Sequence, residues 1–220
     1  MKSLFDRFMG GTPAATSAEH AADDEGFFTT QFMERSDSFR SASAWTGRAL
    51  GVGAHGIPKD VGLTALDKVW GKDHFYAALE ALEKQKLADY LEFVTVPAGR
   101  ELIVQEEKGD YALIVLQGVV AVDRIQPMGL RARLAEARDG DVLGEMSLLD
   151  AGARFASCLT LVNCQLAVLT GTALDDMAIE DSRLGMALMA SVARRLSLRT
   201  RQLGARLGAL LVSQDGQATP

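Results

Sequence analysis

The sequence has few of the residues that staple a fold or hold a metal. Its 220 residues include two cysteines, Cys158 and Cys164, which are too few for a disulfide framework and lack the spacing of a zinc site. We expect both to be small buried side chains on neighbouring strands, as in proteins of a reducing compartment. The three histidines, His20, His55 and His74, have no paired nucleophile and no metal-ligand spacing. The sequence therefore indicates no catalytic site and no metal site.

Long apolar runs are also missing. No stretch reaches the run of about 18 apolar residues that a membrane span needs, so we expect no membrane span. The opening residues, MKSLFDRFMGG, contain too short an apolar block for a secretory signal. Both observations lead us to expect a cytoplasmic protein.

An excess of positive charge is absent as well. The sequence has 23 Lys and Arg against 29 Asp and Glu, which leaves a formal net charge of −6. Non-specific nucleic-acid binding depends on neutralising phosphates with Lys and Arg, so this balance argues against it. The charge is uneven, however, because residues 183–206 contain six arginines and no acidic residue. We therefore expect one basic helix in an acidic protein.

The sequence does contain enough apolar material for a core, with 48% hydrophobic residues. We expect residues 1–63 to be an N-terminal extension, largely irregular or disordered, since its first part is rich in Ala, Gly, Thr and acidic residues. Residues 64–180 would hold helices followed by strands, 181–212 a long helix, and 213–220 a polar tail. The aromatic residues of the extension are expected to wrap the folded domain; they are Phe27, Phe28, Phe32, Phe39 and Trp45.

Between residues 91 and 169 the apolar residues form short runs that are separated by turn signals roughly every 8–12 residues. The turns are marked by Pro97–Gly99, Lys108–Asp110, Gly118, Pro127–Gly129 and Asn163. Short strands at such regular spacing are typical of an antiparallel roll or barrel. We therefore predict an α+β fold: an antiparallel, jelly-roll-like β-roll with flanking helices and a long C-terminal helix.

Helical periodicity lies on both sides of the strand region. Residues 64–89 predict two short helices or one helix that is broken near Gly71. After residue 173 an apolar seam runs at spacings of four, four, four, seven, four and three residues; it consists of Leu184, Leu188, Val192, Leu196, Leu203, Leu207 and Leu210. This near-heptad seam fits a helix that pairs with its own copy, and Gly204 and Gly208 would allow close approach. The alternative is a helix that packs only on its own domain.

The stretch Gly140–Ser157, GDVLGEMSLLDAGARFAS, combines an anion site with a sugar acceptor. A glycine followed by Glu145 and a short helix-compatible run favours a one-turn helix whose free N–H groups attract an anion. Arg154, nine residues after Glu145, supplies a fork of donors that suits a phosphate. Glu145 is an acceptor for sugar hydroxyls. Because a phosphate and a ribose together describe a nucleotide, we predict a nucleotide site here.

From Asp73 to Leu211 the sequence resembles the cyclic nucleotide-binding domains of the catabolite activator protein, protein kinase A regulatory subunits and cyclic-nucleotide-gated channels. The resemblance depends on corner glycines in VPAG, VLQGVVAV and GDVLGE, on a phosphate-binding cassette at Leu143–Ser157, and on the helix MASVARRLSLRTRQLGARL. The Glu-to-Arg spacing is that of the kinase branch. The helix resembles the dimerisation helix of the catabolite activator group.

The resemblance implies how the phosphate and the ribose are bound. Arg154 would bind the cyclic phosphate together with backbone N–H groups, and Glu145 would bind the ribose 2′-hydroxyl. The backbone groups are those of Gly144, Glu145, Met146, Ser147 and Ala156. Because the sequence has both Glu145 and Arg154, the resemblance implies a site that is able to bind its ligand.

The resemblance also implies how the base is approached, and here the sequence departs from the family. Val122 and Leu134 would line the wall behind the sugar and base, and Arg195, Arg199 and Thr200 occupy helix positions that approach the base in this family. Arg199 stands where the catabolite activator group has a small polar residue that reads adenine. The arginine either contacts a purine or is a solvated helix residue.

Two further departures concern the roll itself. Phe155 follows the arginine where relatives have Ala, Ser or Thr, so it either stacks on a ligand or packs in the roll, and cyclic GMP is less favoured. Glu106 stands where many members have a turn glycine. Together with Arg199, Phe155 leaves the identity of the base open.

The function that the resemblance implies is a non-catalytic cyclic nucleotide sensor, with cyclic AMP as the first expected ligand and a homodimer formed through residues 183–211. About ten residues follow Leu210, too few for the helix-turn-helix with which catabolite activator relatives read DNA, so we expect a protein partner and no DNA binding. Two alternatives stay open: a receptor for another nucleotide such as cyclic di-GMP, and a dimeric interaction scaffold whose pocket does not signal. In a pocket that no longer binds ligand, Glu145 and Arg154 would form an internal salt bridge.

Overall fold

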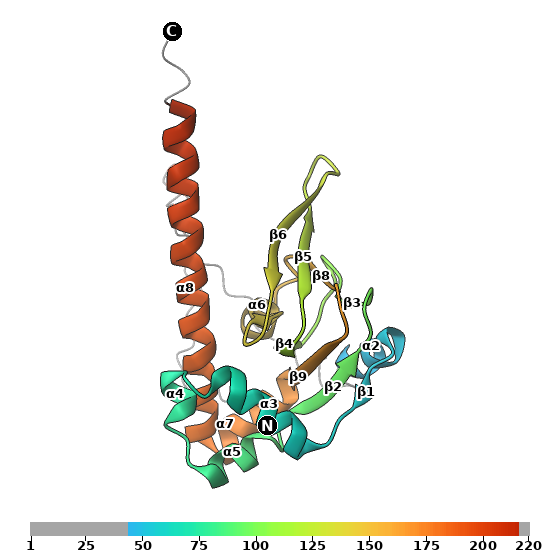
Figure 1. Ribbon diagram of the computed structural model, residues 1–220, viewed down its shortest axis with the longest axis vertical. Coiled ribbons are helices and arrows are strands. Elements are labelled where there is room, and N and C mark those ends of the chain that lie inside the picture. Colours follow the sequence, from blue (N-terminus) through green and yellow to red (C-terminus); the bar gives the residue numbers. More distant parts are fainter. Residues whose placement is uncertain (1–43, 216–220) are drawn as a thin grey trace, which may run out of the picture.

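The computed structural model describes residues 44–215, so the expectations about residues 1–43 and 216–220 fall outside this part. It shows two antiparallel sheets, with several of the short helices at one end and a long helix that runs past the roll (Figure 1). The predicted α+β β-roll is therefore confirmed. Of the aromatic residues expected to wrap the domain, only Trp45 lies in the described part, and it is 1% exposed. No helix in this part is long and apolar enough to cross a bilayer.

The strands form a five-stranded sheet of order β1-β2-β9-β4-β7 and a four-stranded sheet of order β3-β8-β5-β6, and their ladders are antiparallel. They are β1 (His55–Gly56), β2 (Glu92–Val96), β3 (Glu101–Ile103), β4 (Tyr111–Gln117), β5 (Val120–Ile125), β6 (Arg131–Ala137), β7 (Val142–Leu143), β8 (Ser157–Thr160) and β9 (Cys164–Thr170). All five predicted turns lie between consecutive strands. The two-residue strands β1 and β7 are too short to show an alternating pattern.

Helices flank the strands on both sides in the sequence. They are α2 (Ala44–Val52), α3 (Lys59–Trp70), α4 (His74–Ala77), α5 (Ala81–Leu87), α6 (Glu145–Asp150), α7 (Gly171–Glu180) and α8 (Ser182–Asp215). As predicted, the helical region breaks near Gly71, which is the residue that ends α3.

The expectation of irregular structure was wrong for residues 44–63. This segment forms α2, β1 and the beginning of α3, although it is rich in glycine. Gly47 and Gly51 lie inside α2, where each lowers helix propensity by about 1 kcal/mol relative to alanine. Burial of Trp45 and Val52 offsets this penalty, because tertiary packing supplies most of the stability of a short helix.

Strand β4 separates two hydrophobic cores. Its alternate residues Ala112, Ile114 and Leu116 belong to a core shared with α3, α5, α7 and α8. The residues between them, Tyr111, Leu113 and Val115, belong to a second core inside the roll. Because successive strand residues point to opposite faces, β4 is buried on both sides. The five-stranded sheet is thus the middle layer, between the helices and the four-stranded sheet. The two cysteines are buried free thiols, as expected. They do not lie on neighbouring strands, because β8 and β9 belong to different sheets.

Helix α8 is held to the domain along its first half. Leu184, Leu188 and Val192 are buried in the core that the helices share. Further along the same seam, Leu203 is 62% exposed and Leu207 56% exposed. The seam is therefore divided: its first part packs on its own domain, and its second part has an open apolar surface.

A buried carboxylate fixes the first half of α8. Asp73 accepts hydrogen bonds from the backbone N–H groups of Phe75 and Tyr76 at the start of α4. It also accepts one from the hydroxyl of Ser191 at 2.6 Å and one from Arg195 at 2.9 Å. Burial acts to raise the pKa of Asp73, but these hydrogen bonds and the charge of Arg195 outweigh it, so the pKa is lowered. The ionised Asp73 thus joins α4 to α8.

Candidate functional site

The turn into α6 can be made only by glycine. Gly144 precedes α6 in the left-handed conformation, with φ of 76°. A Cβ at this position would lie 2.6 Å from Nη1 of Arg154 and 3.0 Å from the carbonyl oxygen of Tyr111. The backbone of Gly144 therefore lies directly against the guanidinium of Arg154, and the predicted turn and the predicted arginine form one unit.

Arg154 is buried, and its guanidinium is oriented by backbone carbonyls. It is 3% exposed, and it donates to the carbonyl oxygens of Gly144 and Tyr111, both at 2.9 Å. Its guanidinium also lies over the ring of Tyr111, 4.4 Å from the centroid. Burial lowers the pKa of Arg154, although the tyrosine partly opposes this. The arginine is held in one orientation, as a residue that receives an anion must be.

The backbone of Arg154 is held too, by the loop between β3 and β4. The N–H of Arg154 donates to the carbonyl of Glu107 at 2.9 Å, and the N–H of Glu106 donates to the carbonyl of Arg154 at 2.8 Å. Glu106 has φ of 67°, the left-handed conformation that favours glycine. The residue that departs from the family pattern thus keeps the backbone shape of a glycine and contributes to the position of Arg154.

Glu145 is directed toward α8. It is 6% exposed, and its Oε1 accepts a hydrogen bond from Nη1 of Arg199 at 3.0 Å. Arg199 also forms an ion pair with Asp141 at 3.3 Å. Burial raises the pKa of Glu145, and the positive charges of Arg199 and Arg154 only partly oppose this. Glu145 and Arg154 thus have different partners among the described residues, unlike the internal salt bridge of a pocket that no longer binds ligand.

The remaining residues expected in the cassette differ in exposure. Ser147 and Ala156 are buried, and Met146 is 46% exposed. Phe155 is 51% exposed, the guanidinium of Arg124 lies 4.2 Å above its ring, and Arg124 also donates to the carbonyl of Phe155. One face of this phenyl ring is therefore in contact with a cation.

The two expected wall residues lie on the paired strands β5 and β6. Val122 packs against the core inside the roll, and Leu134 is 38% exposed. The register of the two strands shifts between Val122 and Asp123, so that the neighbouring residue Asp123 faces Arg133. The wall is therefore built at an irregularity of the ladder.

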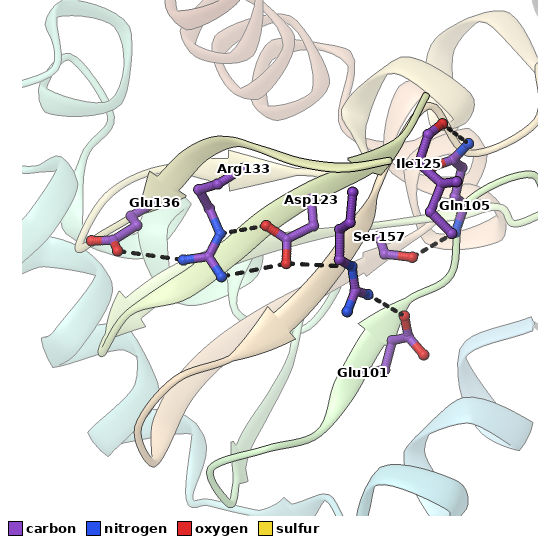
Figure 2. A network of polar contacts seen from close by, with 8 residues as sticks. Glu101, Gln105, Asp123, Ile125, Arg133, Glu136 and Ser157 are labelled. Atoms are coloured by element: carbon purple, nitrogen blue, oxygen red, sulfur yellow. Dashed lines mark hydrogen bonds and ion pairs between the residues drawn. The ribbon is translucent and has the colours of Figure 1, made fainter. Parts of the chain in front are cut away.

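A polar network secures this irregularity (Figure 2). Asp123 is 5% exposed, accepts a hydrogen bond from Arg133 and forms an ion pair with Arg131 at 3.7 Å. Gln105 joins the loop after β3 to β5, because its side chain exchanges hydrogen bonds with the backbone of Ile125. The backbone N–H of Gln105 also donates to the hydroxyl of Ser157 at 3.0 Å. The network thus joins β5 to β6, β8 and the end of β3 on the face opposite to Val122.

Two of the helix residues that the resemblance implies near the base make contacts within the chain. Arg195 donates to Asp73 at 2.9 Å and to the carbonyl of Gly140 at 3.2 Å, and its guanidinium lies 4.0 Å above the ring of Trp70. Thr200 is exposed, and its hydroxyl donates to the carbonyl of Leu196 in the preceding turn. The structure brings Arg199 to the cassette, whereas the contacts of Arg195 and Thr200 hold the helix itself.

Sequence reasoning missed two residues that contact Arg154. Gly109 was assigned only to a turn, but a Cβ there would lie 2.6 Å from Nη2 of Arg154. Tyr111 was assigned only to a strand, but its carbonyl and its ring both touch the guanidinium. The glycine in this turn was the one available signal, because a turn glycine also permits close approach of another group.

The fold and this arrangement define a β-roll that holds an arginine and a glutamate for a ligand. Residues 93–181 match the family model described as the cyclic nucleotide-binding domain. The match includes the cassette with Glu145 and Arg154. It includes neither α2 nor α8.

A curated relative covers a similar part of the chain. It is the CRP-like cAMP-activated global transcriptional regulator of Mycobacterium tuberculosis, which is 25% identical over 131 residues, 60% of this chain and 58% of the relative. The chain therefore spans less than two thirds of the length of the curated relatives that it matches.

Solved structures share the fold. A cyclic nucleotide-binding domain from Methylobacillus flagellatus KT has a TM-score of 0.67 and 22% identity, over 79% of this chain and 94% of that chain. The N-terminal domain of a transcriptional regulator from Streptomyces coelicolor A3(2) has a TM-score of 0.52 and 28% identity, over 61% and 94%. The Thermus thermophilus catabolite activator protein has a TM-score of 0.52 and 27% identity, over 61% and 62%.

Proposed function

We propose that this chain is a non-catalytic sensor that binds cyclic AMP and regulates a partner protein through movement of α8. Arg154 would receive the cyclic phosphate. Its bonds to the carbonyls of Gly144 and Tyr111 use two of the five N–H donors of a guanidinium and leave the others for an anion. The name of the Mycobacterium tuberculosis relative supports cyclic AMP as the ligand.

The observation that carries the proposal is the ion pair between Glu145 and Arg199. Glu145 is the residue to which the family resemblance assigns the ribose hydroxyl, and Arg199 lies 54 positions later, on α8. A ribose that hydrogen-bonds to Glu145 changes the balance of this ion pair. A ligand shifts such an equilibrium by no more than the difference between its affinities for the two arrangements. The ion pair is therefore the physical link from ligand to helix.

The packing under Glu145 supports movement of α8. Glu145 lines a cavity of about 10 Å³ between α6 and α8, together with apolar residues such as Leu148, Leu188 and Val192. This cavity is no larger than one water molecule needs, so a change at Glu145 has to be accommodated by moving α6 against α8. Interfaces packed in this way shift between discrete arrangements.

The output that we propose is a homodimer whose α8 helices pass the movement to a protein partner. The exposed apolar residues Leu203 and Leu207 of α8 would pair with a second copy. The net charge of −6 favours a protein partner over DNA, since DNA binding depends on neutralising phosphates.

Isothermal titration calorimetry of the purified full chain with cyclic AMP tests the ligand. We expect one site per chain, and we expect Arg154→Lys to bind roughly 10–100-fold more weakly. Lysine keeps the charge but loses the planar fork, and a hydrogen bond to a charged group is worth about 1.5–3 kcal/mol. Arg183→Lys is the matched control, because Arg183 is an exposed arginine of α8 that pairs with Glu83 far from the cassette.

Parallel titrations with cyclic GMP and cyclic di-GMP decide between the alternatives. Binding of cyclic di-GMP without cyclic AMP would overturn the ligand that we propose and keep a nucleotide receptor. No heat with any of the three nucleotides would overturn the sensor and leave an interaction scaffold. Equal loss of affinity in Arg154→Lys and Arg183→Lys would contradict the assigned role of Arg154.

A further inference from the structure

Helix α2 packs against the side of the roll although it lies outside residues 93–181, which match the family. Trp45 is the anchor of this contact, since it is 1% exposed and its ring lies 5.3 Å from the ring of Tyr111. Its indole N–H donates to Glu92 on β2 at 3.0 Å. The first turn of α2 is thus fixed against both β2 and β4.

Two polar contacts extend from α2 to the loop before β4. Arg48 forms an ion pair with Glu107. The backbone N–H of Ala44 donates to Oδ1 of Asp110 at 3.2 Å. With the contact between Trp45 and Tyr111, α2 touches residues 107–111 at three points.

The same loop also holds Arg154. The carbonyl of Glu107 accepts the backbone N–H of Arg154, and the carbonyl of Tyr111 accepts its Nη2. The Tyr111 ring has the Trp45 ring on one side at 5.3 Å and the Arg154 guanidinium at 4.4 Å. Gly109 allows the loop to lie directly against this guanidinium. The loop 106–111 therefore connects α2 to the phosphate-binding arginine.

We propose that Trp45 and Arg48 are positioning residues for Arg154, and that α2 is part of the ligand-binding apparatus of this chain. The inference rests on the proposed function, because it assigns α2 to the site that receives the cyclic phosphate. An arginine side chain loses much conformational freedom when it is fixed, so a loop that fixes it beforehand raises affinity. Docking of α2 and binding of the phosphate are then coupled, and each strengthens the other by the same factor.

Calorimetry with cyclic AMP on full-length variants tests the coupling. We expect Trp45→Ala to raise Kd about tenfold, equivalent to about 1.4 kcal/mol, and Trp45→Phe to restore Kd to within about threefold of the wild type. Phenylalanine keeps an aromatic ring against Tyr111 and loses only the bond to Glu92. We expect Arg48→Ala to raise Kd as well.

A matched variant separates positioning from simple destabilisation. Leu66 is fully buried in the other core, so Leu66→Ala lowers the melting temperature without touching the loop 106–111. At a temperature where all variants are folded, Leu66→Ala should keep the wild-type Kd. If Trp45→Ala and Leu66→Ala lower the melting temperature alike and both keep the wild-type Kd, α2 is only structural and the inference is overturned.

Hydrogen exchange distinguishes failure of this inference from failure of the proposed function. If the wild type binds no cyclic nucleotide, amide exchange of the ligand-free protein still tests whether α2 positions Arg154. Faster exchange of the Glu106 and Arg154 amides in Trp45→Ala, but not in Leu66→Ala, would show that α2 positions Arg154. Unchanged exchange of both amides in Trp45→Ala would overturn the inference.

Discussion

Glu145 lies at the centre of the site, and its burial makes a negative charge on its side chain unfavourable. The residue is 6% exposed, and burial raises its pKa despite the nearby charge of Arg199. The ionised form therefore destabilises the fold relative to the protonated form. Functional sites typically contain a binding residue whose ionised form lowers the stability of the fold.

The effect of Glu145→Gln on the stability of the fold is expected to depend on pH, because the penalty comes from the ionised carboxylate. A carboxylate with a raised pKa contributes no penalty below the pKa of the unfolded chain, and its penalty is complete once pH has risen above the folded pKa. The melting temperature of Glu145→Gln relative to the wild type should therefore increase as pH rises from about 4 toward 8. Scanning calorimetry over a pH series measures it.

Glu136→Gln controls for the removal of one negative charge, because the side chain of Glu136 is 40% exposed. A relative melting temperature of Glu145→Gln that falls as pH rises would contradict the raised pKa. The substitution should have opposite effects on stability and on affinity. Glu145→Gln should bind cyclic AMP more weakly than the wild type, since it loses a charge-assisted hydrogen bond to the ribose.

Among the helices, α8 combines two different environments in one element. Its first half is fixed by Leu184, Leu188 and the bonds from Ser191 and Arg195 to Asp73. Its second half carries Arg199 and the exposed leucines. Arg199 stands at the boundary between them, so a change at Glu145 acts where α8 leaves the domain.

Arg199→Ala is expected to separate binding from helix movement. The ion pair is partly exposed and is worth about 1 kcal/mol, so the affinity for cyclic AMP should stay within about fivefold of the wild type. The change in amide exchange that cyclic AMP causes along residues 196–209 of the wild type should be lost. Arg201→Ala, an exposed arginine on the same helix, should keep it. A full response of α8 in Arg199→Ala would show that the signal takes another route.

At the scale of the whole molecule, the second half of α8 carries an exposed apolar surface. Leu203 and Leu207 are more than half exposed, and a Cβ added at Gly204 or Gly208 would meet no group outside its own helix backbone within 4 Å. A helix with this surface is stabilised by pairing with a second helix. The proposed dimer would use the part of the seam that its own domain does not cover.

Leu203→Glu combined with Leu207→Glu is expected to give a monomer. Light scattering after gel filtration should show a mass that falls from twice 23.6 kDa to 23.6 kDa. Two charges in an apolar seam prevent close packing of the helices, because burying an unpaired charge costs several kcal/mol. Leu82→Glu is the control, since Leu82 on α5 is 71% exposed and outside the seam. A wild type that is monomeric at all concentrations would contradict the dimer.

The sequence by itself determined the β-roll and the cassette, because both are encoded locally. Glycines and prolines at corners set the strand boundaries, and the spacing of Glu145 and Arg154 lies within one turn-helix-turn segment. Local propensity also explains why the expectation for residues 44–63 was wrong. Residues 44–63 are rich in glycine, and the burial of Trp45 and Val52 stabilises α2.

The tertiary structure alone decided which groups meet in the site. Arg195 and Arg199 are four residues apart on one helix, yet Arg195 binds Asp73, 122 positions away, and Arg199 binds Glu145, 54 positions away. Tyr111 contacts Arg154 across 43 positions. Such contacts depend on how the helices and sheets pack and on where each side chain then points, which spacing along one element does not specify. The link from Trp45 through Tyr111 to Arg154 is of this kind, and it exists only in the folded molecule.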